Sequence, residues 1–274
     1  MSGILYIVAT PIGNLEDITL RALRVLKEVD VIAAEDTRQT LKLLNHFEIS
    51  KPLISYHRHN EEFKSDILLE KLKNGENIAL VSDAGTPGIC DPGEEIIKKA
   101  VEGDIKIIPI PGACAMINAL IASGIDTKEF NFLGFLPLNK KLRKEKIEEI
   151  KNSNKTVIIY EAPHKMKNTL EDLKEILNNR KIVLAREITK IHEEFIRGNI
   201  EELTQKIDGL KGEMILIIEG NKEKDNIENN ELINMSLEEH YKYYENQGLD
   251  KKEIIKRIAK DRNVSKNEIY MYFV

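Results

Sequence analysis

A chain of 274 residues, 42% of them hydrophobic, is long enough for two domains of ordinary size with buried cores. The net charge of −5 argues against indiscriminate nucleic-acid binding, which usually needs a basic domain, but local basic patches can still bind RNA. No run approaches the about 18 apolar residues of a membrane span, and the first residues lack the basic and apolar regions of a signal peptide. We therefore expect a cytoplasmic protein with no membrane contact. Cys90 and Cys114 have no CxxC partners, so we expect buried free thiols rather than a disulfide or a zinc site.

The first half of the chain alternates apolar runs with amphipathic segments, which predicts β-α-β units. The expected strands are residues 3–9, 29–34, 53–56, 78–82 and 105–110. The expected helices are residues 18–28, 39–47, 62–73 and 94–102, and a further helix begins near residues 111–115.

The most informative stretch is residues 78–93, IALVSDAGTPGICDPG. Asp83 falls where a buried strand should end, and ligands of open α/β sheets sit at the carboxyl ends of strands. Gly85 and Gly88 permit positive φ and leave room for a ligand, while Pro87 and Pro92 stiffen the loop. The loop has neither a P-loop nor a GxGxxG pattern, so a phosphate-rich nucleotide is disfavoured. The alternative is an ordinary strand-to-helix connection.

Other predicted strands also end in loops of unusual composition. Pro11 and Gly13 follow the first strand, and the charged residues 35–38, EDTR, follow the second. The small residues 111–115, PGACA, begin a helix whose N-terminal backbone donors can face a ligand, or else allow tight helix packing. His57, His59 and Glu61 have metal-ligand residue types but an unspecific spacing, so we expect no metal.

The second half of the chain repeats the alternation of strands and helices. We expect strands at residues 132–136, 156–161, 181–187 and 212–219, and helices at residues 165–177 and 200–207. Residues 138–152 form a lysine-rich helical segment, which is either a solvated face or a contact for nucleic-acid phosphates.

The composition suggests four units along the chain. We expect an N-terminal α/β domain at residues 1–118, a second α/β domain at residues 119–221 and a charged linker at residues 222–236. Residues 237–274 then form a C-terminal domain of three short helices, for which a packing role is more typical than a DNA-binding motif.

Eight motifs, in order, resemble one known family. They are VATPIGNLEDITLRAL, AEDTR, SYHRHNE, VSDAGTPGICDPG, IPGACA, GFLP, YEAPHK and ARE-I-TK-x-HEE. They are similar to those of the ribosomal small-subunit RNA methyltransferase I family, in the tetrapyrrole-methylase superfamily, over essentially the first 220 residues. The resemblance implies S-adenosylmethionine-dependent 2'-O-methylation of a cytidine in the decoding centre of 16S RNA within the 30S subunit. It also implies two α/β domains with the cofactor in the cleft between them, and a homodimer.

The resemblance also assigns expected roles to individual residues. The expected cofactor-binding residues are Pro11, Ile12, Asp83, Ala84, Gly85, Gly112, Cys114, Ala115, Glu161 and Ala162. Ala84 stands where the broader superfamily has proline, and Cys114 where it has threonine, which separates this branch from the tetrapyrrole enzymes. The expected catalytic residues are Glu187, Lys190 and Arg38.

Methyl transfer from a sulfonium to a ribose oxygen is an in-line displacement that depends mainly on alignment. The hydroxyl must also lose its proton, and the residue types leave Glu187, Lys190, His57 and Asp36 open as acceptors. Two other functions remain as alternatives at this point. One is methylation of a tetrapyrrole carbon, and the other is a non-catalytic RNA-binding assembly factor.

Overall fold

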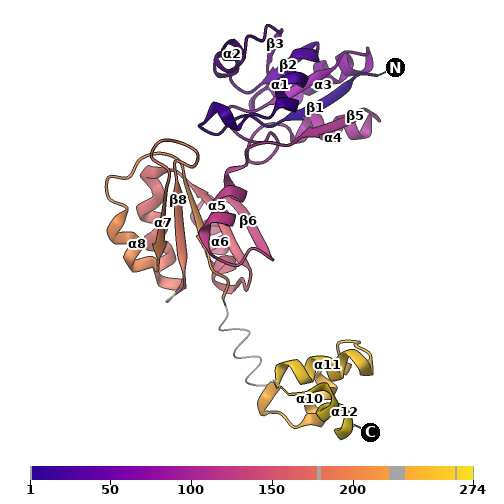
Figure 1. The fold of residues 1–274 in the computed structure, drawn as a ribbon, viewed down its shortest axis with the longest axis vertical. Coiled ribbons are helices and arrows are strands. Elements are labelled where there is room, and N and C mark those ends of the chain that lie inside the picture. The colour runs from indigo at the N-terminus through magenta and orange to yellow at the C-terminus, as the bar shows by residue number, and fades with distance from the viewer. Residues whose placement is uncertain (1, 178–179, 222–231, 263, 274) are drawn as a thin grey trace.

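The computed structural model describes residues 2–177, 180–221, 232–262 and 264–273. Two α/β domains, each built on a five-stranded sheet, are followed by a C-terminal helical unit (Figure 1). This confirms the expected fold class. None of the helices in the described ranges is long and apolar enough to cross a membrane.

The N-terminal sheet is entirely parallel, with strand order β3-β2-β4-β1-β5. Its strands are β1 (Ile4–Val8), β2 (Val31–Ala34), β3 (Leu53–Ser55), β4 (Ile78–Val81) and β5 (Lys106–Ile110). Pro109 is tolerated in β5 because that strand lies at the sheet edge and pairs only with β1. The parallel arrangement brings the carboxyl ends of all five strands to one side of the domain.

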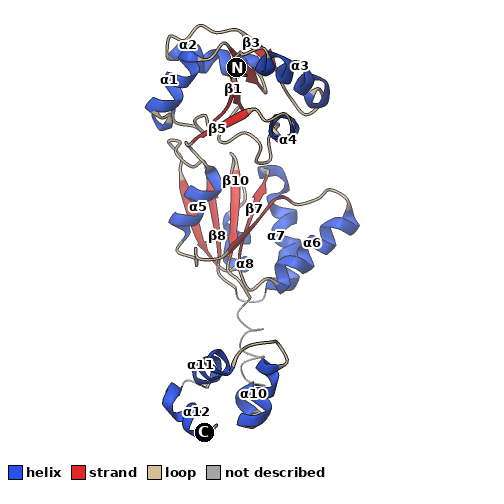
Figure 2. Cartoon of the chain, turned by 90° about the vertical axis from the view of Figure 1, so that its right-hand side faces the viewer, coloured by secondary structure: helices blue, strands red, loops and turns tan. Residues whose placement is uncertain are grey.

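Helices cover both faces of this sheet (Figure 2). They are α1 (Leu20–Glu28), α2 (Thr37–His46), α3 (Glu61–Lys73) and α4 (Glu94–Glu102). Along β4, Ile78 and Leu80 pack with the helices α3 and α4, while Ala79 and Val81 pack with α1 and α2. Since side chains alternate between the two faces of a strand, a run of four apolar residues fits a strand buried on both sides.

The second sheet is mixed, with strand order β6-β7-β10-β8-β9. Its strands are β6 (Phe130–Phe135), β7 (Thr156–Glu161), β8 (Ile182–Arg186), β9 (Glu194–Gly198) and β10 (Met214–Ile218). Only β6 and β7 pair in parallel, whereas β10 runs antiparallel to both of its neighbours. Strand β9 was not expected from the sequence, because this edge strand has only Phe195 and Ile196 as large apolar residues and lacks a clear apolar run.

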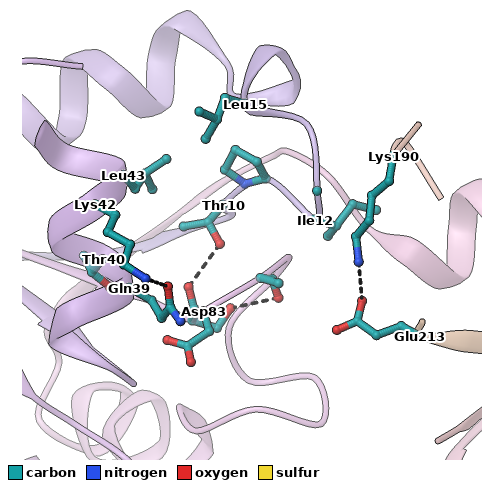
Figure 3. A pocket seen from close by; sticks show the side chains of 14 residues that line it. Thr10, Ile12, Leu15, Gln39, Thr40, Lys42, Leu43, Asp83, Lys190 and Glu213 are labelled. Atoms are coloured by element: carbon teal, nitrogen blue, oxygen red, sulfur yellow. Dashed lines mark hydrogen bonds and ion pairs between the residues drawn. The ribbon is translucent and has the colours of Figure 1, made fainter. Parts of the chain in front are cut away.

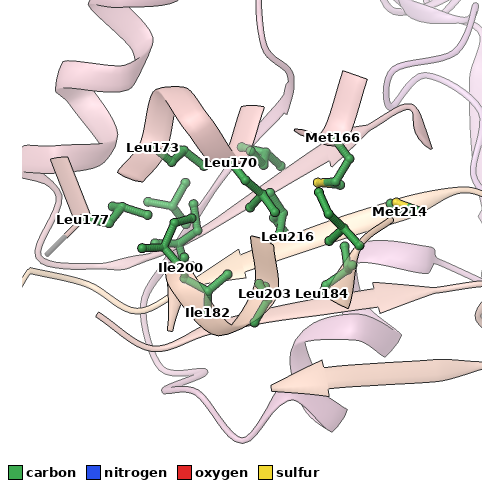
Figure 4. Close-up of a cluster of buried hydrophobic side chains, with 14 of the residues drawn as sticks. Met166, Leu170, Leu173, Leu177, Ile182, Leu184, Ile200, Leu203, Met214 and Leu216 are labelled. Carbon is green, nitrogen blue, oxygen red and sulfur yellow. The ribbon is translucent and has the colours of Figure 1, made fainter. Parts of the chain in front are cut away.

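Helices α6 (Lys140–Asn152), α7 (Pro163–Leu177) and α8 (Ile200–Lys206) enclose the main core of the second domain (Figure 4). Helix α5 (Ala115–Ser123) covers the opposite face of the sheet, where Ala119 and Leu120 pack with Ile158 and Ile215. The expected domain boundary at residue 118 is therefore wrong, since the whole of α5 belongs to the second domain.

The C-terminal unit consists of α10 (Leu237–Glu245), α11 (Lys251–Asp261) and α12 (Lys266–Tyr272) around a small apolar cluster. Leu232 is buried in that cluster, so this unit begins before the expected boundary at residue 237. Most of the expected linker, residues 222–231, lies outside the described residues.

The start of α4 is capped by side chains from elsewhere in the chain. Its N-cap is Gly93, which has no side chain, so Glu61 Oε1 accepts a hydrogen bond from the Gly93 N–H at 2.9 Å. The hydroxyl of the fully buried Tyr56 accepts one from the Ile96 N–H at 3.2 Å and lies 3.0 Å from Ser65 Oγ. These contacts fix the loop between β4 and α4, because the helix end is where that loop finishes.

We predict that Tyr56→Phe lowers the free energy of unfolding by about 1–3 kcal/mol, since it leaves the buried Ile96 N–H and the Ser65 hydroxyl without this partner. Urea unfolding monitored by circular dichroism measures the change. Tyr6→Phe is the matched control, because Tyr6 lies in the same sheet and its hydroxyl makes no hydrogen bond within the described part of the chain. Equal losses in both variants would contradict the capping role.

Candidate functional site

The loops that follow β1 and β4 are joined to each other. The Thr10 N–H donates to Gly85 O at 2.8 Å, and the Gly85 N–H donates to Thr10 O at 3.1 Å. Thr10 Oγ1 also donates to Ser82 O at 3.0 Å. Two strand ends therefore form one continuous rim at the carboxyl edge of the N-terminal sheet.

Gly85 has φ of +82°, which confirms the expected need for glycine at this position. A Cβ there would lie 3.3 Å from Ile12 Cγ2 and 3.7 Å from Ala113 O. The missing side chain allows the loop to pack against Ile12. Gly85 also lines the cavity described next, so its role in leaving room for a ligand stays a prediction.

A cavity of about 410 Å³ lies between the two α/β domains, and we call it the α5 cavity. The N-terminal domain contributes both loops of the rim, and the second domain contributes the first residues of α5, Phe135, the end of β7 and the beginning of β10. Its lining is Ile12, Glu35, Asp83–Thr86, Ile89–Asp91, Cys114, Ala115, Phe135, Tyr160–Pro163, Ile188 and Glu213–Ile215.

Eight of the ten expected cofactor-binding residues line the α5 cavity. They are Ile12, Asp83, Ala84, Gly85, Cys114, Ala115, Glu161 and Ala162. Gly112 lines neither of the two cavities described here, and a Cβ on it would lie 2.8 Å from the Ala9 Cβ, so its small size serves packing against β1. Pro11 lines a second cavity on the other side of Ile12.

That second cavity, which we call the α2 cavity, has a volume of about 430 Å³ (Figure 3). Its lining is Thr10–Gly13, Leu15, Gln39, Thr40, Lys42, Leu43, Ser82–Ala84, Lys190 and Glu213. The two cavities share Ile12, Asp83, Ala84 and Glu213, so a thin wall separates two adjoining chambers of one cleft.

Carboxylates give the α5 cavity a negative character. Burial, and next the nearby Glu35 carboxylate, raise the pKa of Asp91 to about 6, while Arg58 opposes the shift. Burial also raises the pKa of Glu35, whose carboxylate accepts a weak hydrogen bond from the Asp83 N–H at 3.4 Å. A cavity with this many acidic groups suits a positively charged ligand.

Two of the three expected catalytic residues meet at the α2 cavity. Lys190 Nζ lies 3.0 Å from Glu187 Oε1 and 3.8 Å from Glu213 Oε2. Glu187 lines neither cavity but holds the lysine that does. A Cβ on Gly212 would lie 2.1 Å from Glu187 Oε1, so Gly212 provides the space for this carboxylate.

Arg38, the third expected catalytic residue, lies outside the lining of both cavities. Its guanidinium binds the carboxylate of Asp36, with Nη2 2.7 Å from Oδ2, and its side chain is 87% exposed. His57 pairs with Asn60 and lines neither cavity. Throughout the described ranges, His, Cys, Asp and Glu side chains form no group of three or more that could hold a metal ion.

The cavity residues that come from α2 and from the start of β10 were not expected from the sequence. Because β10 is antiparallel to β7, the first residues of β10 lie beside the last residues of β7, and Met214 pairs with Glu161. A rule that searches only the carboxyl ends of strands therefore cannot find Glu213. The α2 residues begin directly after the EDTR motif, which is the one signal that pointed toward them.

The lysine-rich segment has a partly structural role. Arg143 binds Asp172 at 2.7 Å and donates to Thr169 Oγ1 at 2.8 Å, and Thr169 in turn donates to Glu161 Oε2 at 2.6 Å. Arg143 thus supports a wall of the α5 cavity. Lys140, Lys141 and Lys144 remain exposed on α6.

Comparison with known proteins identifies the family. Residues 4–204 match the model of the Tetrapyrrole (Corrin/Porphyrin) Methylases. A protein of Halalkalibacterium halodurans named ribosomal RNA small subunit methyltransferase I is 52% identical over 98% of this chain and 93% of its own length. This chain belongs to the ribosomal RNA small subunit methyltransferase I family. The Bacillus subtilis protein of the same name is 50% identical, again over 98% of this chain and 93% of its own length.

Solved structures with the same fold come from more distant proteins. Uroporphyrin-III-C-methyltransferase from Thermus thermophilus has a TM-score of 0.56 at 21% identity, and the match covers 79% of this chain and 94% of that one. A diphthine synthase gives a TM-score of 0.60 at 16% identity, over 79% of this chain and 90% of that one. These matches show that the two α/β domains of this ribosomal RNA small subunit methyltransferase I family member share the fold of the wider superfamily.

The raised pKa of Asp91 predicts a pH-dependent stability. Between about pH 4 and pH 6 the folded protein retains a proton that the unfolded chain releases, so Asp91 lowers stability as the pH rises through this window. We expect the free energy of unfolding of Asp91→Asn, relative to that of the wild type, to increase from pH 4 to pH 6. Above pH 6 this difference should stay constant. Urea unfolding at pH 4 and pH 7.5 checks this, and an equal difference at both values would contradict it.

Proposed function

We propose that this protein transfers a methyl group from S-adenosylmethionine to the ribose 2'-oxygen of a cytidine in the decoding centre of 16S ribosomal RNA. The family membership and the names of the relatives support methylation of small-subunit ribosomal RNA. The observation that carries the proposal is the pair of adjoining cavities that meet at Ile12 and Ala84, since transfer between two molecules requires two sites in contact.

The α5 cavity suits the cofactor. Its volume of about 410 Å³ lies in the range of small-molecule sites, and most of its walls are apolar. The carboxylates of Glu35, Asp83 and Asp91 offer partners for hydroxyl and cationic groups. A related Thermus thermophilus methyltransferase, 16% identical, has been solved in complex with S-adenosyl homocysteine.

When bound, S-adenosylmethionine supplies an electrophilic methyl group on a positively charged sulfur. Ile12 and Ala84, in the shared wall, fix the distance between the two chambers and exclude water from the contact. Lys190 is held by two carboxylates, so its Nζ acts as a hydrogen-bond donor toward a ribose or phosphate oxygen rather than as the proton acceptor. This leaves the Glu213 carboxylate, which lines both chambers and lies beside Lys190, to accept the hydroxyl proton.

The substrate RNA carries a phosphate backbone that needs positive partners. Lys140, Lys141 and Lys144 are exposed on α6 and provide such partners beyond the cleft. Arg143 is excluded from this role because it binds Asp172 and Thr169. The proposed substrate, the 30S ribosomal subunit, places the reaction in the cytoplasm.

Transfer of tritiated methyl groups from S-adenosylmethionine to unmethylated 30S particles tests the function, and ribose-methylation mapping of the 16S RNA identifies the nucleotide. A uroporphyrinogen-type substrate is assayed in parallel. Label in the tetrapyrrole alone would overturn the RNA assignment, and absence of S-adenosylmethionine binding in calorimetry would favour a non-catalytic assembly factor.

We further propose a homodimer formed through α5. Ile117 and Ile121, one helical turn apart, are 38% and 67% exposed on this apolar helix. Burying such a pair against a second copy removes apolar surface from water. We predict a light-scattering mass of twice 31.4 kDa for the wild type and a monomer for Ile121→Glu, and a monomeric wild type at micromolar concentration would contradict the dimer.

We predict that Ala84→Leu weakens S-adenosylmethionine binding at least tenfold while the unfolding midpoint stays within experimental error. The exposed Ala84 side chain faces both cavities, so extra methyl groups fill space that the ligands need rather than the core. Calorimetry measures the affinity. Gln205→Leu, an exposed change on α8 outside both linings, is the control, and unchanged affinity in Ala84→Leu would remove this wall from the binding site.

A further inference from the structure

The α2 cavity contains polar side chains, among them Gln39 and Asp83, that have no role in the methyl-transfer step described above. With the cofactor in the α5 cavity, as proposed above, the chamber across Ile12 and Ala84 is where the acceptor nucleotide must lie. We infer that the α2 cavity receives the base of the target nucleotide, turned out of the RNA, and that Gln39 and Asp83 select cytosine. This inference rests on the proposed function.

The walls of the α2 cavity suit a flat heterocycle. Pro11, Leu15 and Leu43 contribute apolar surface, and the cavity volume of about 430 Å³ is ample for one nucleotide-sized ligand. Enzymes that act on a nucleotide within structured nucleic acid often turn it out into such a pocket and recognise its pairing edge there.

The orientation of the Gln39 amide follows from its neighbour. Lys42 Nζ lies 3.1 Å from Gln39 Oε1, and an ammonium group can only donate, so the oxygen of the amide must face Lys42 (Figure 3). The Gln39 NH₂ group therefore remains to donate toward a ligand. Gln39 presents donors to the cavity rather than acceptors.

Asp83 provides the complementary acceptor. Its Oδ1 accepts a hydrogen bond from the Asp36 N–H at 2.9 Å, which orients the carboxylate in the lining of the cavity. Cytosine offers an amino donor at N4 and acceptors at N3 and O2, whereas uracil has an acceptor at O4 and a donor at N3. A site with a carboxylate acceptor and amide donors therefore matches cytosine. With uracil in the same place, the O4 acceptor would face the carboxylate and the N3–H donor would face the amide NH₂ group.

Lys190 completes the arrangement from the second domain. Figure 3 shows Gln39 and Lys42 projecting from α2 on one side of the cavity, with Lys190 and Glu213 on the other. A base bound at the α2 side leaves its sugar and phosphate toward Lys190. The Lys190 ammonium group is then near the RNA phosphates and can bind them through opposite charge.

The test is Gln39→Glu, which keeps the size of the side chain and its attraction to Lys42 but replaces the amide donors with acceptors. We expect kcat/KM for 30S particles to fall at least about tenfold, as for loss of a base contact with two hydrogen bonds, while the Kd for S-adenosylmethionine changes less than twofold. On particles that carry uridine at the target position, the variant should lose less, so the cytidine-to-uridine ratio of kcat/KM decreases. Gln205→Glu on α8, exposed and outside both cavities, is the matched control and should behave as the wild type.

Three results would overturn the inference. Wild-type kcat/KM in Gln39→Glu would show that Gln39 does not contact the base, and an unchanged cytidine-to-uridine ratio would show that it does not select the base. A loss of S-adenosylmethionine affinity equal to the loss of turnover would assign the α2 cavity to the cofactor. Failure of the proposed function itself is distinguishable, because the unaltered protein would then leave 30S particles unmethylated.

Discussion

The exchange of main-chain hydrogen bonds between Thr10 and Gly85 is the constraint on which the site depends. A parallel sheet brings the ends of β1 and β4 together, but it leaves the loops beyond them unpaired. The two hydrogen bonds form an antiparallel bridge just beyond the parallel strands, and the positive φ of Gly85 makes this turn of the loop possible. Ile12 and Ala84 lie in these two loops, and the hydrogen bonds thereby fix them as the wall between the two cavities.

The second domain completes both cavities from the opposite side. Glu213 immediately precedes β10 and lines both of them, while Lys190 lies in the loop after β8. A hydrogen bond from Thr189 Oγ1 to Asp17 joins this loop to the N-terminal domain. The cleft is therefore formed by chain segments from both domains, and its shape depends on how the two domains are held together.

Backbone strain is concentrated at this cleft. Among the described residues, five that are not glycine have positive φ, and Glu48 and Asp104 follow the ends of α2 and α4, where a left-handed residue is common. The other three are Cys90, Glu187 and Thr189. Cys90 lines the α5 cavity, and Glu187 and Thr189 lie in the loop that positions Lys190. Strained residues persist where the surrounding contacts hold them, and here these contacts preorganise the site.

The sequence by itself determined the two α/β units, nearly all of their strands and helices, and the loops of the rim. Apolar runs such as residues 78–81 and amphipathic helices indicate burial directly, and the motifs indicate a family.

Tertiary structure decided the rest. Residues 194–198 became a strand only because the edge of β8 was available for pairing, and α5 joined the second domain because its apolar face matched that sheet. Glu213 reached the cleft because β10 is antiparallel, and Arg143 left the basic surface because Asp172 and Thr169 lie beside it. Each outcome depends on which distant segments become neighbours, and local sequence patterns do not encode that information.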